Sequence, residues 1–172
     1  MRTQRKAIAQ IPDAMLDLHA ERFPEAFERN AVIAMFALRA LAQRINDVTN
    51  ESLAPFGLNA AKYNYLVVLY LANRPGLTLS EISEQIHTSN ATVTSMIAAL
   101  ERDGMLARSA HPQDGRSVVI RLTAKGRKRV EAAVPVHRRD IESALSDLSI
   151  AEREQLSRLL MKVSAGFDRR AG

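Results

Sequence analysis

Small polar side chains gather at the start of one predicted helix, between residues 88 and 95. Thr78 with Glu81 three residues later matches a capping box, and Ile82 and Ile86 give the short helix that follows one buried stripe. A second helix reaches Arg102. Two helices joined by a tight turn are typical of a helix-turn-helix, whose second helix can hydrogen-bond base edges and phosphates. A solvated helix face beside a cap would show the same residues. The candidate DNA-contacting residues of this segment are Thr88, Ser89, Asn90, Thr92, Thr94 and Ser95.

A basic β-hairpin is predicted directly after these helices. The runs 105–108 and 117–122 favour strands, and Asp114-Gly115 is a strong turn signal. Between residues 105 and 129 seven basic residues stand against one acid. An arginine at such a tip can enter a narrow, electronegative minor groove, and a neighbouring carboxylate can hold it in the required pose. The candidate DNA-contacting residues of the hairpin are Arg108, Asp114 and Arg116.

Three runs in this region carry a family resemblance. They are Leu100–Arg108, His111–Ser117 and Ile120–Gly126. In this order and spacing the sequence resembles the MarR family of winged-helix regulators, whose hallmark is an Asp-x-Arg in the wing, here Asp114-Gly115-Arg116, followed by a strand that ends in Leu-Thr and then a Gly. The resemblance implies a mainly α fold: a winged helix-turn-helix with a small β-hairpin wing.

The segments that flank this region predict amphipathic helices with unusually broad apolar faces. From residue 25 to 54 the apolar residues Phe27, Ala31, Ala34, Leu38, Leu41, Ile45 and Val48 follow a repeat of about 3.5 residues. After the wing, Thr123 caps a helix to about Leu148, with a kink at Pro135, and Ser149 with Glu152 opens a last helix.

So much apolar surface favours a two-fold dimer, and the resemblance implies one built from the first and last helices. The predicted division is an arm and short helix at 1–24, a winged helix-turn-helix at 55–123, and a helical dimerisation region from the N- and C-terminal helices at 25–54 and 124–172. The candidate dimerisation residues are Phe27, Leu148, Leu156, Leu159, Leu160 and Val163.

Composition favours a soluble protein with a polyanionic partner. The net charge is +5 and the sequence pI is near 10.0, which strengthens binding to nucleic acid through counterion release. No apolar run approaches the roughly 20 residues that span a bilayer, and no apolar stretch follows the basic N-terminus, so we expect a cytoplasmic protein without membrane contact. The chain has no cysteine, which excludes disulfides and thiolate chemistry.

Nothing in the sequence points to catalysis. The four histidines, at positions 19, 87, 111 and 137, lack metal-ligand spacing, and no nucleophile elbow, P-loop or dinucleotide fingerprint occurs. We therefore expect no catalytic residue, metal or cofactor, and no enzyme.

The resemblance also implies a small effector, often an aromatic or phenolic anion, bound between the dimer helices and the DNA-binding lobe. Candidate ligand residues are Arg39, Tyr63 and Tyr65. A solvated Arg39 and tyrosines at a core edge are the simpler interpretation of the same residues. The expected function is a dimeric repressor of a pseudo-palindromic operator, released by an aromatic acid or its CoA thioester. The alternative is a helical interaction module whose basic wing binds an acidic protein or RNA.

Overall fold

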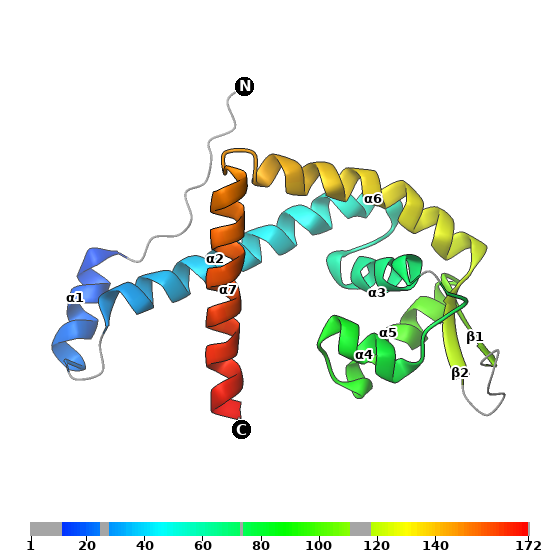
Figure 1. Cartoon of the computed structure of the whole chain (residues 1–172), viewed down its shortest axis with the longest axis horizontal. Coiled ribbons are helices and arrows are strands. Elements are labelled where there is room, and N and C mark those ends of the chain that lie inside the picture. Colours follow the sequence, from blue (N-terminus) through cyan, green and yellow to red (C-terminus); the bar gives the residue numbers. More distant parts are fainter. Residues whose placement is uncertain (1–11, 25–27, 73, 111–117, 172) are drawn as a thin grey trace. The chain divides into compact units, whose positions relative to one another are not determined.

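Helices and one small hairpin make up the computed structural model, which describes residues 12–24, 28–72, 74–110 and 118–171 (Figure 1). The chain forms two compact units, Met1–Ala61 and Lys62–Gly172. The predicted fold class, mainly α with a two-stranded antiparallel hairpin, is confirmed. No helix in the described ranges combines the length and the apolarity that crossing a bilayer demands.

The first unit is dominated by one long helix. A short α1 (Asp13–Arg22) precedes α2 (Arg29–Leu53), and the 3-10 turn η1 (Ala54–Phe56) ends the run. The carboxylate of Glu28 accepts the backbone N–H groups of Asn30 and Ala31, which satisfies donors that the first turn of α2 leaves unpaired. The predicted apolar stripe of α2 is largely open to solvent, since Leu41 and Ile45 are exposed.

The second unit contains the helix-turn-helix and the wing. After α3 (Ala60–Leu71), which begins at the unit boundary, come α4 (Leu79–Ile86) and α5 (Asn90–Arg102). Strands β1 (Leu106–Ala110) and β2 (Val118–Leu122) follow, and α6 (Ala124–Ala144) and α7 (Ile150–Ala171) complete the chain. The largest fully buried side chains of this unit are Leu66, Leu77, Ile82, Val93, Ile97, Leu100, Ile120 and Val130.

The wing is tied to the segment that precedes α4. β1 and β2 pair antiparallel, with Leu106 opposite Leu122 and Ala110 opposite Val118. Leu77 adds a third extended position, because its N–H donates to Ile120 O at 3.0 Å and Ile120 N–H donates back at 2.7 Å. The start of α4 and the base of the wing are therefore held by paired backbone hydrogen bonds.

The cap residues predicted from the sequence are confirmed, whereas one helix end was wrong. Thr123 accepts the N–H of Gly126 at the start of α6, and Ser149 and Glu152 exchange the two hydrogen bonds of a capping box. α6 ends at Ala144 rather than at about Leu148, because Leu145 (φ −104°, ψ 7°) leaves the helical conformation. Pro135 lies inside α6, which continues on both sides of it.

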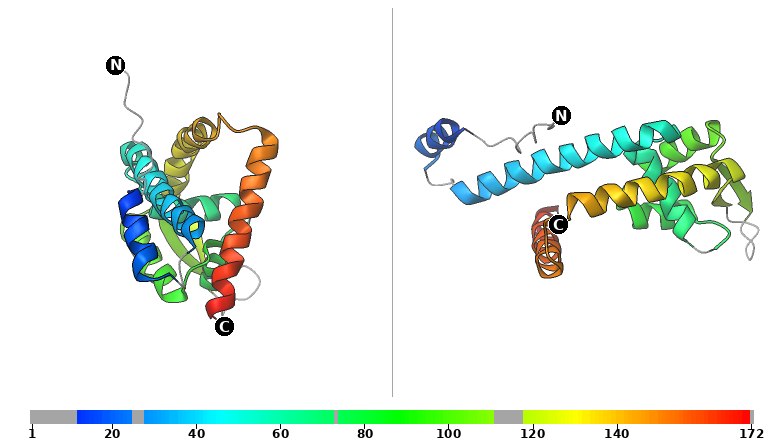
Figure 2. Two further views of the ribbon diagram at one scale, coloured as in Figure 1. Left: turned by 90° about the vertical axis from the view of Figure 1, so that its left-hand side faces the viewer. Right: turned by 90° about the horizontal axis from the view of Figure 1, so that it is seen from above.

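α7 packs no side chain into the core. In Figure 1 and the right-hand view of Figure 2 it stands clear of α3, α4 and α5. Of its residues 150–169, all are exposed except the half-buried Gly166. Its apolar stripe thus has no partner among the described residues of this unit.

Candidate nucleic-acid interface

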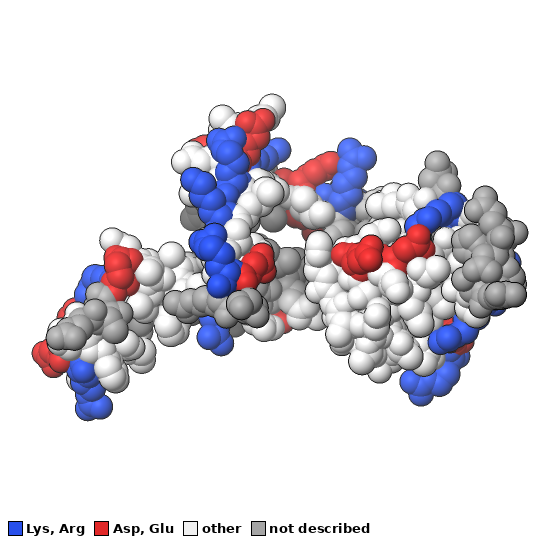
Figure 3. Space-filling model, turned by 60° about the horizontal axis from the view of Figure 1, so that its bottom comes forward, with Lys and Arg blue, Asp and Glu red and all other residues white. Residues whose placement is uncertain are grey.

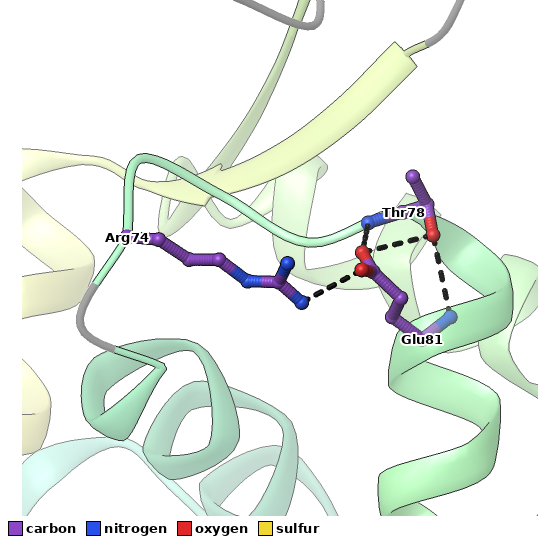
Figure 4. Close-up of polar contacts among 3 residues, drawn as sticks. All are labelled: Arg74, Thr78 and Glu81. Atoms are coloured by element: carbon purple, nitrogen blue, oxygen red, sulfur yellow. Dashed lines mark hydrogen bonds and ion pairs between the residues drawn. The ribbon is translucent and has the colours of Figure 1, made fainter.

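The start of α4 is fixed by a three-residue network that Figure 4 shows. Thr78 Oγ1 accepts the N–H of Glu81 at 3.3 Å, and Glu81 Oε2 accepts the Thr78 N–H at 2.8 Å. Arg74 Nη2 lies 2.7 Å from Glu81 Oε1. The backbone hydrogen bond from Thr78, supported by the Thr78 hydroxyl and Arg74, lowers the pKa of Glu81. The cap therefore uses the ionised carboxylate.

Replacing Glu81 with alanine should lower the free energy of unfolding at pH 7 by about 1 kcal/mol, as loss of a helix cap does. Because folding lowers the pKa of Glu81 from 4.5, its charge contributes fully above that value, and the contribution is lost as the pH falls through the lowered pKa. Urea unfolding of both proteins from pH 7 into acid measures this. The difference in free energy of unfolding between the wild type and Glu81→Ala should become smaller in acid. Glu84→Ala, on the same helix, should have the same free energy of unfolding as the wild type. A difference for Glu81→Ala that is independent of pH would contradict the role of the carboxylate.

The turn between α4 and α5 is short and internally bonded. His87 follows Ile86 with φ 55° and ψ 51°. The Thr88 N–H donates to Ser83 O at 3.2 Å, and the Ser83 hydroxyl donates to Thr88 O. Ser89 then caps α5 by accepting the N–H of Thr92 at 3.3 Å. These bonds set the position of α5 relative to α4.

The polar residues at the start of α5 lie outside its buried stripe. Val93, Ile97 and Leu100 are fully buried. The Thr94 hydroxyl donates to Asn90 O at 2.8 Å, so only its lone pairs stay available. The side chains of Asn90 and Ser95 form no hydrogen bond within the described ranges. Of the six candidates in this segment Thr88 is half-buried, and the exposed ones are Ser89, Asn90, Thr92, Thr94 and Ser95.

In the wing, Arg108 pairs with the carboxylate of Glu101, a partner that was not predicted from the sequence. Its Nε lies 3.1 Å from Glu101 Oε1 and 3.2 Å from Oε2. This bifurcated hydrogen bond links the last turn of α5 to β1, which suits a residue that positions the wing. A DNA contact by Arg108 stays a prediction. Asp114 and Arg116 lie outside the described residues.

The end of α5 is anchored to two other helices. Lys62 Nζ of α3 lies 2.7 Å from Asp103 Oδ2, and Lys125 Nζ of α6 donates to Asp103 O at 2.6 Å. The hydrogen bond and charge of Lys62 lower the pKa of Asp103. Arg127 of α6 lies over the Tyr70 ring of α3, 5.5 Å from its centroid. These contacts therefore hold the end of α5, where the wing begins, against α3 and α6.

Charge is distributed in local groups over the surface. Figure 3 shows basic and acidic side chains close to one another with wide uncharged areas between the groups. Three of the described ion pairs, Lys62–Asp103, Arg74–Glu81 and Arg108–Glu101, belong to the helix-turn-helix and wing. The basic side chains of these three pairs therefore hold the helix-turn-helix and the wing in position.

The predicted ligand residues fall into both units. Tyr63 and Tyr65 of α3 are buried, and burial raises the pKa of each hydroxyl. The Tyr63 ring meets His137 of α6 edge-on, with centroids 4.8 Å apart. His137 Nδ1 and Asp140 Oδ2 are buried and have no hydrogen-bond partner in the described chain. Neither His137 nor Asp140 is among the ligand residues predicted from the sequence. Arg39 is an exposed residue of α2, in the first unit.

The predicted dimerisation residues are mostly open to solvent. Leu148 is half-buried, and Phe27 lies outside the described residues. The exposed members, all on α7, are Leu156 (36%), Leu159 (51%), Leu160 (43%) and Val163 (40%). An apolar row at this spacing along an exposed helix has the form of a helix-packing face.

Comparison with known proteins gives consistent matches. The family model described as MarR family matches residues 58–118. The chain is 34% identical over 132 residues to the uncharacterized HTH-type transcriptional regulator YkoM of Bacillus subtilis (strain 168), covering 75% of this chain and 84% of YkoM. It is 27% identical over 142 residues to the HTH-type transcriptional repressor YetL of the same strain, covering 83% and 84%. The structure of the S. aureus MepR–DNA complex superposes with a TM-score of 0.72 at 26% identity, covering 77% of this chain and 95% of MepR.

Proposed function

The chain belongs to the MarR family of transcriptional regulators, and from this premise we propose that it is a dimeric repressor that binds a pseudo-palindromic operator and is released by a small ligand. The observation that carries the proposal is the exposed polar start of α5, held in a bonded frame. Asn90 and Ser95 present unused hydrogen-bonding groups there, and such groups on a helix in the major groove distinguish base pairs. The MepR match, a DNA complex, supports DNA as the partner.

The proposed dimer supplies the second half of the binding surface. The open stripe of α7 and the exposed apolar residues of α2, among them Phe36, Leu41 and Ile45, are faces that a second copy can cover. Two-fold pairing would present two α5 helices to half-sites about 34–36 Å apart, one turn of the duplex. A repressor role is supported by the likeness to YetL, a transcriptional repressor.

The proposed effector is a small aromatic acid or its CoA thioester. Tyr63, His137 and Asp140 place a phenol, an imidazole and a carboxylate on α3 and α6, and two of their buried atoms lack partners in the described chain. The phenol and imidazole can donate hydrogen bonds to a ligand carboxylate, and the carboxylate can accept one from a ligand hydroxyl. A ligand that prefers one arrangement of the two lobes would shift the population away from the DNA-binding state. Thermal-shift measurements on the DNA-free protein, with aromatic acids and acyl-CoA compounds, test this part.

Replacing Asn90 with alanine should weaken binding to the preferred site by about tenfold or more, the usual effect of one lost base contact. Affinity for random duplex and the salt dependence should stay unchanged, since a base contact carries no counterion release. Selection from a random duplex library, followed by fluorescence anisotropy at fixed salt, measures both. Asn64→Ala on the exposed side of α3 is the matched control. Selection of the same site with equal affinity by Asn90→Ala would remove α5 as the reading element, and equal wild-type affinity for all duplexes and RNA would remove the proposed function.

A further inference from the structure

His87 adopts a backbone conformation that is uncommon for any residue other than glycine. Its φ of 55° and ψ of 51° place it in the left-handed region, and among the described residues the others with positive φ are glycines. For a residue with a Cβ this region costs roughly 1–2 kcal/mol, whereas glycine adopts it freely. The conformation itself is required, because it ends α4 and turns the chain so that the Thr88 N–H reaches Ser83 O at 3.2 Å. Glycine would serve that backbone role better.

The His87 side chain does not offset this strain through contacts within the described chain. It is exposed, and it forms no hydrogen bond, ion pair or ring contact with any described residue. Two other described histidines differ, because His19 stacks near Phe23 and His137 meets Tyr63. A strained residue whose side chain contacts nothing in the described chain indicates that this side chain binds a partner.

The place of His87 in the fold identifies that role. It stands two residues before Ser89, which caps α5, in a turn that the Ser83–Thr88 hydrogen bonds hold in position. When the first turn of α5 enters the major groove, the preceding helix and its turn cross the phosphate backbone that borders the groove. An imidazole N–H is a donor for a phosphate oxygen.

We propose that His87 donates a hydrogen bond to a DNA phosphate beside the major groove and so fixes the position of α5 on the duplex. The proposal rests on the proposed function, since it takes DNA as the partner. It adds a contact that is independent of base sequence, and it explains why a residue less suited than glycine occupies the turn. The surrounding structure maintains the strained backbone conformation, and the side chain forms its hydrogen bond only when DNA is bound.

The variant His87→Gly separates fold from function, because the two readouts should move in opposite directions. Its melting temperature should rise by about 2–4 °C as the strain is relieved. Its affinity for DNA should fall by about tenfold for each half-site bound, the effect of one lost hydrogen bond to a charged group per copy. The loss should be equal on the selected site and on random duplex, because phosphate contacts carry no sequence information. Differential scanning fluorimetry and anisotropy titrations on both duplexes give these values.

Two companion variants sharpen the test. His87→Asn keeps an N–H donor and tolerates the left-handed region, so its affinity should stay within about threefold of the wild type. Gln85→Ala, an exposed neighbour on α4, should change neither readout. Unchanged affinity of His87→Gly, or a fall in affinity together with a lower melting temperature, would overturn the proposal. Because random duplex also reports the phosphate contact, a wild type without site preference would reject the proposed function while still testing His87.

Discussion

Replacing Leu159 and Leu160 with glutamate is expected to yield monomers that keep the fold of the DNA-binding lobe and bind the operator about a thousandfold more weakly. The lobe should stay folded because these side chains are 51% and 43% exposed and contribute nothing to its core. A second copy would bury them, and the two carboxylates from each copy would be desolvated in that interface without partners. Affinity falls because two half-sites bound as one unit gain on the order of 10² to 10⁴ over a single site.

Analytical ultracentrifugation, a thermal melt and operator titration together read this change. Met161→Glu introduces the same charge on the same helix at a residue that is 72% exposed and lies off the apolar stripe, so it should remain dimeric. A double variant that stays dimeric would remove α7 as the interface. A monomeric variant that binds the operator with full affinity would show that operator binding does not depend on the dimer. An unfolded variant would show that the α7 stripe supports its own subunit, contrary to its exposure.

The features predicted correctly from the sequence depend on residues close together along the chain. A cap joins positions three apart, so the pairs Thr78 with Glu81 and Ser149 with Glu152 identify the starts of α4 and α7 directly. The β-favouring runs that predict the two strands of the wing are equally local. Such patterns fix the element order, and the family resemblance then supplies the topology.

The framework around α5 could not be predicted because its partners are distant in sequence. Lys62 and Asp103 are 41 positions apart, and Lys125 and Asp103 are 22 apart. The sequence showed Arg108 as one more cation of the wing, and only the fold reveals that Glu101 engages it. His87 is the converse case: the sequence predicts a tight turn between the two helices, but it does not show which residue of the turn adopts the left-handed conformation.

The second large effect is expected from a substitution of a glycine near the wing. Gly126 lies in the first turn of α6, and a Cβ there would come closer than 3.0 Å to Met105 O, with Leu122 Cδ2 at 3.2 Å. The Met105 carbonyl cannot retreat without loss, because it accepts the N–H of Thr123 at 3.0 Å and the Thr123 hydroxyl at 3.1 Å. We expect Gly126→Ala to lower the free energy of unfolding by about 3 kcal/mol, at the upper end of overpacking effects.

The control is a second helical glycine with open space around it. A Cβ on Gly166 of α7 would have Arg169 Nη2 at 3.8 Å as its nearest neighbour, so Gly166→Ala should raise stability by roughly 0.5–1 kcal/mol through helix propensity. Urea unfolding of both variants should thus give changes of opposite sign from the same substitution. Equal stabilisation would mean that α6 does not press on the Met105 carbonyl. Since Thr123 and Met105 join the base of the wing to α6, Gly126→Ala should also weaken operator binding where the variant is still folded, whereas Gly166→Ala should not.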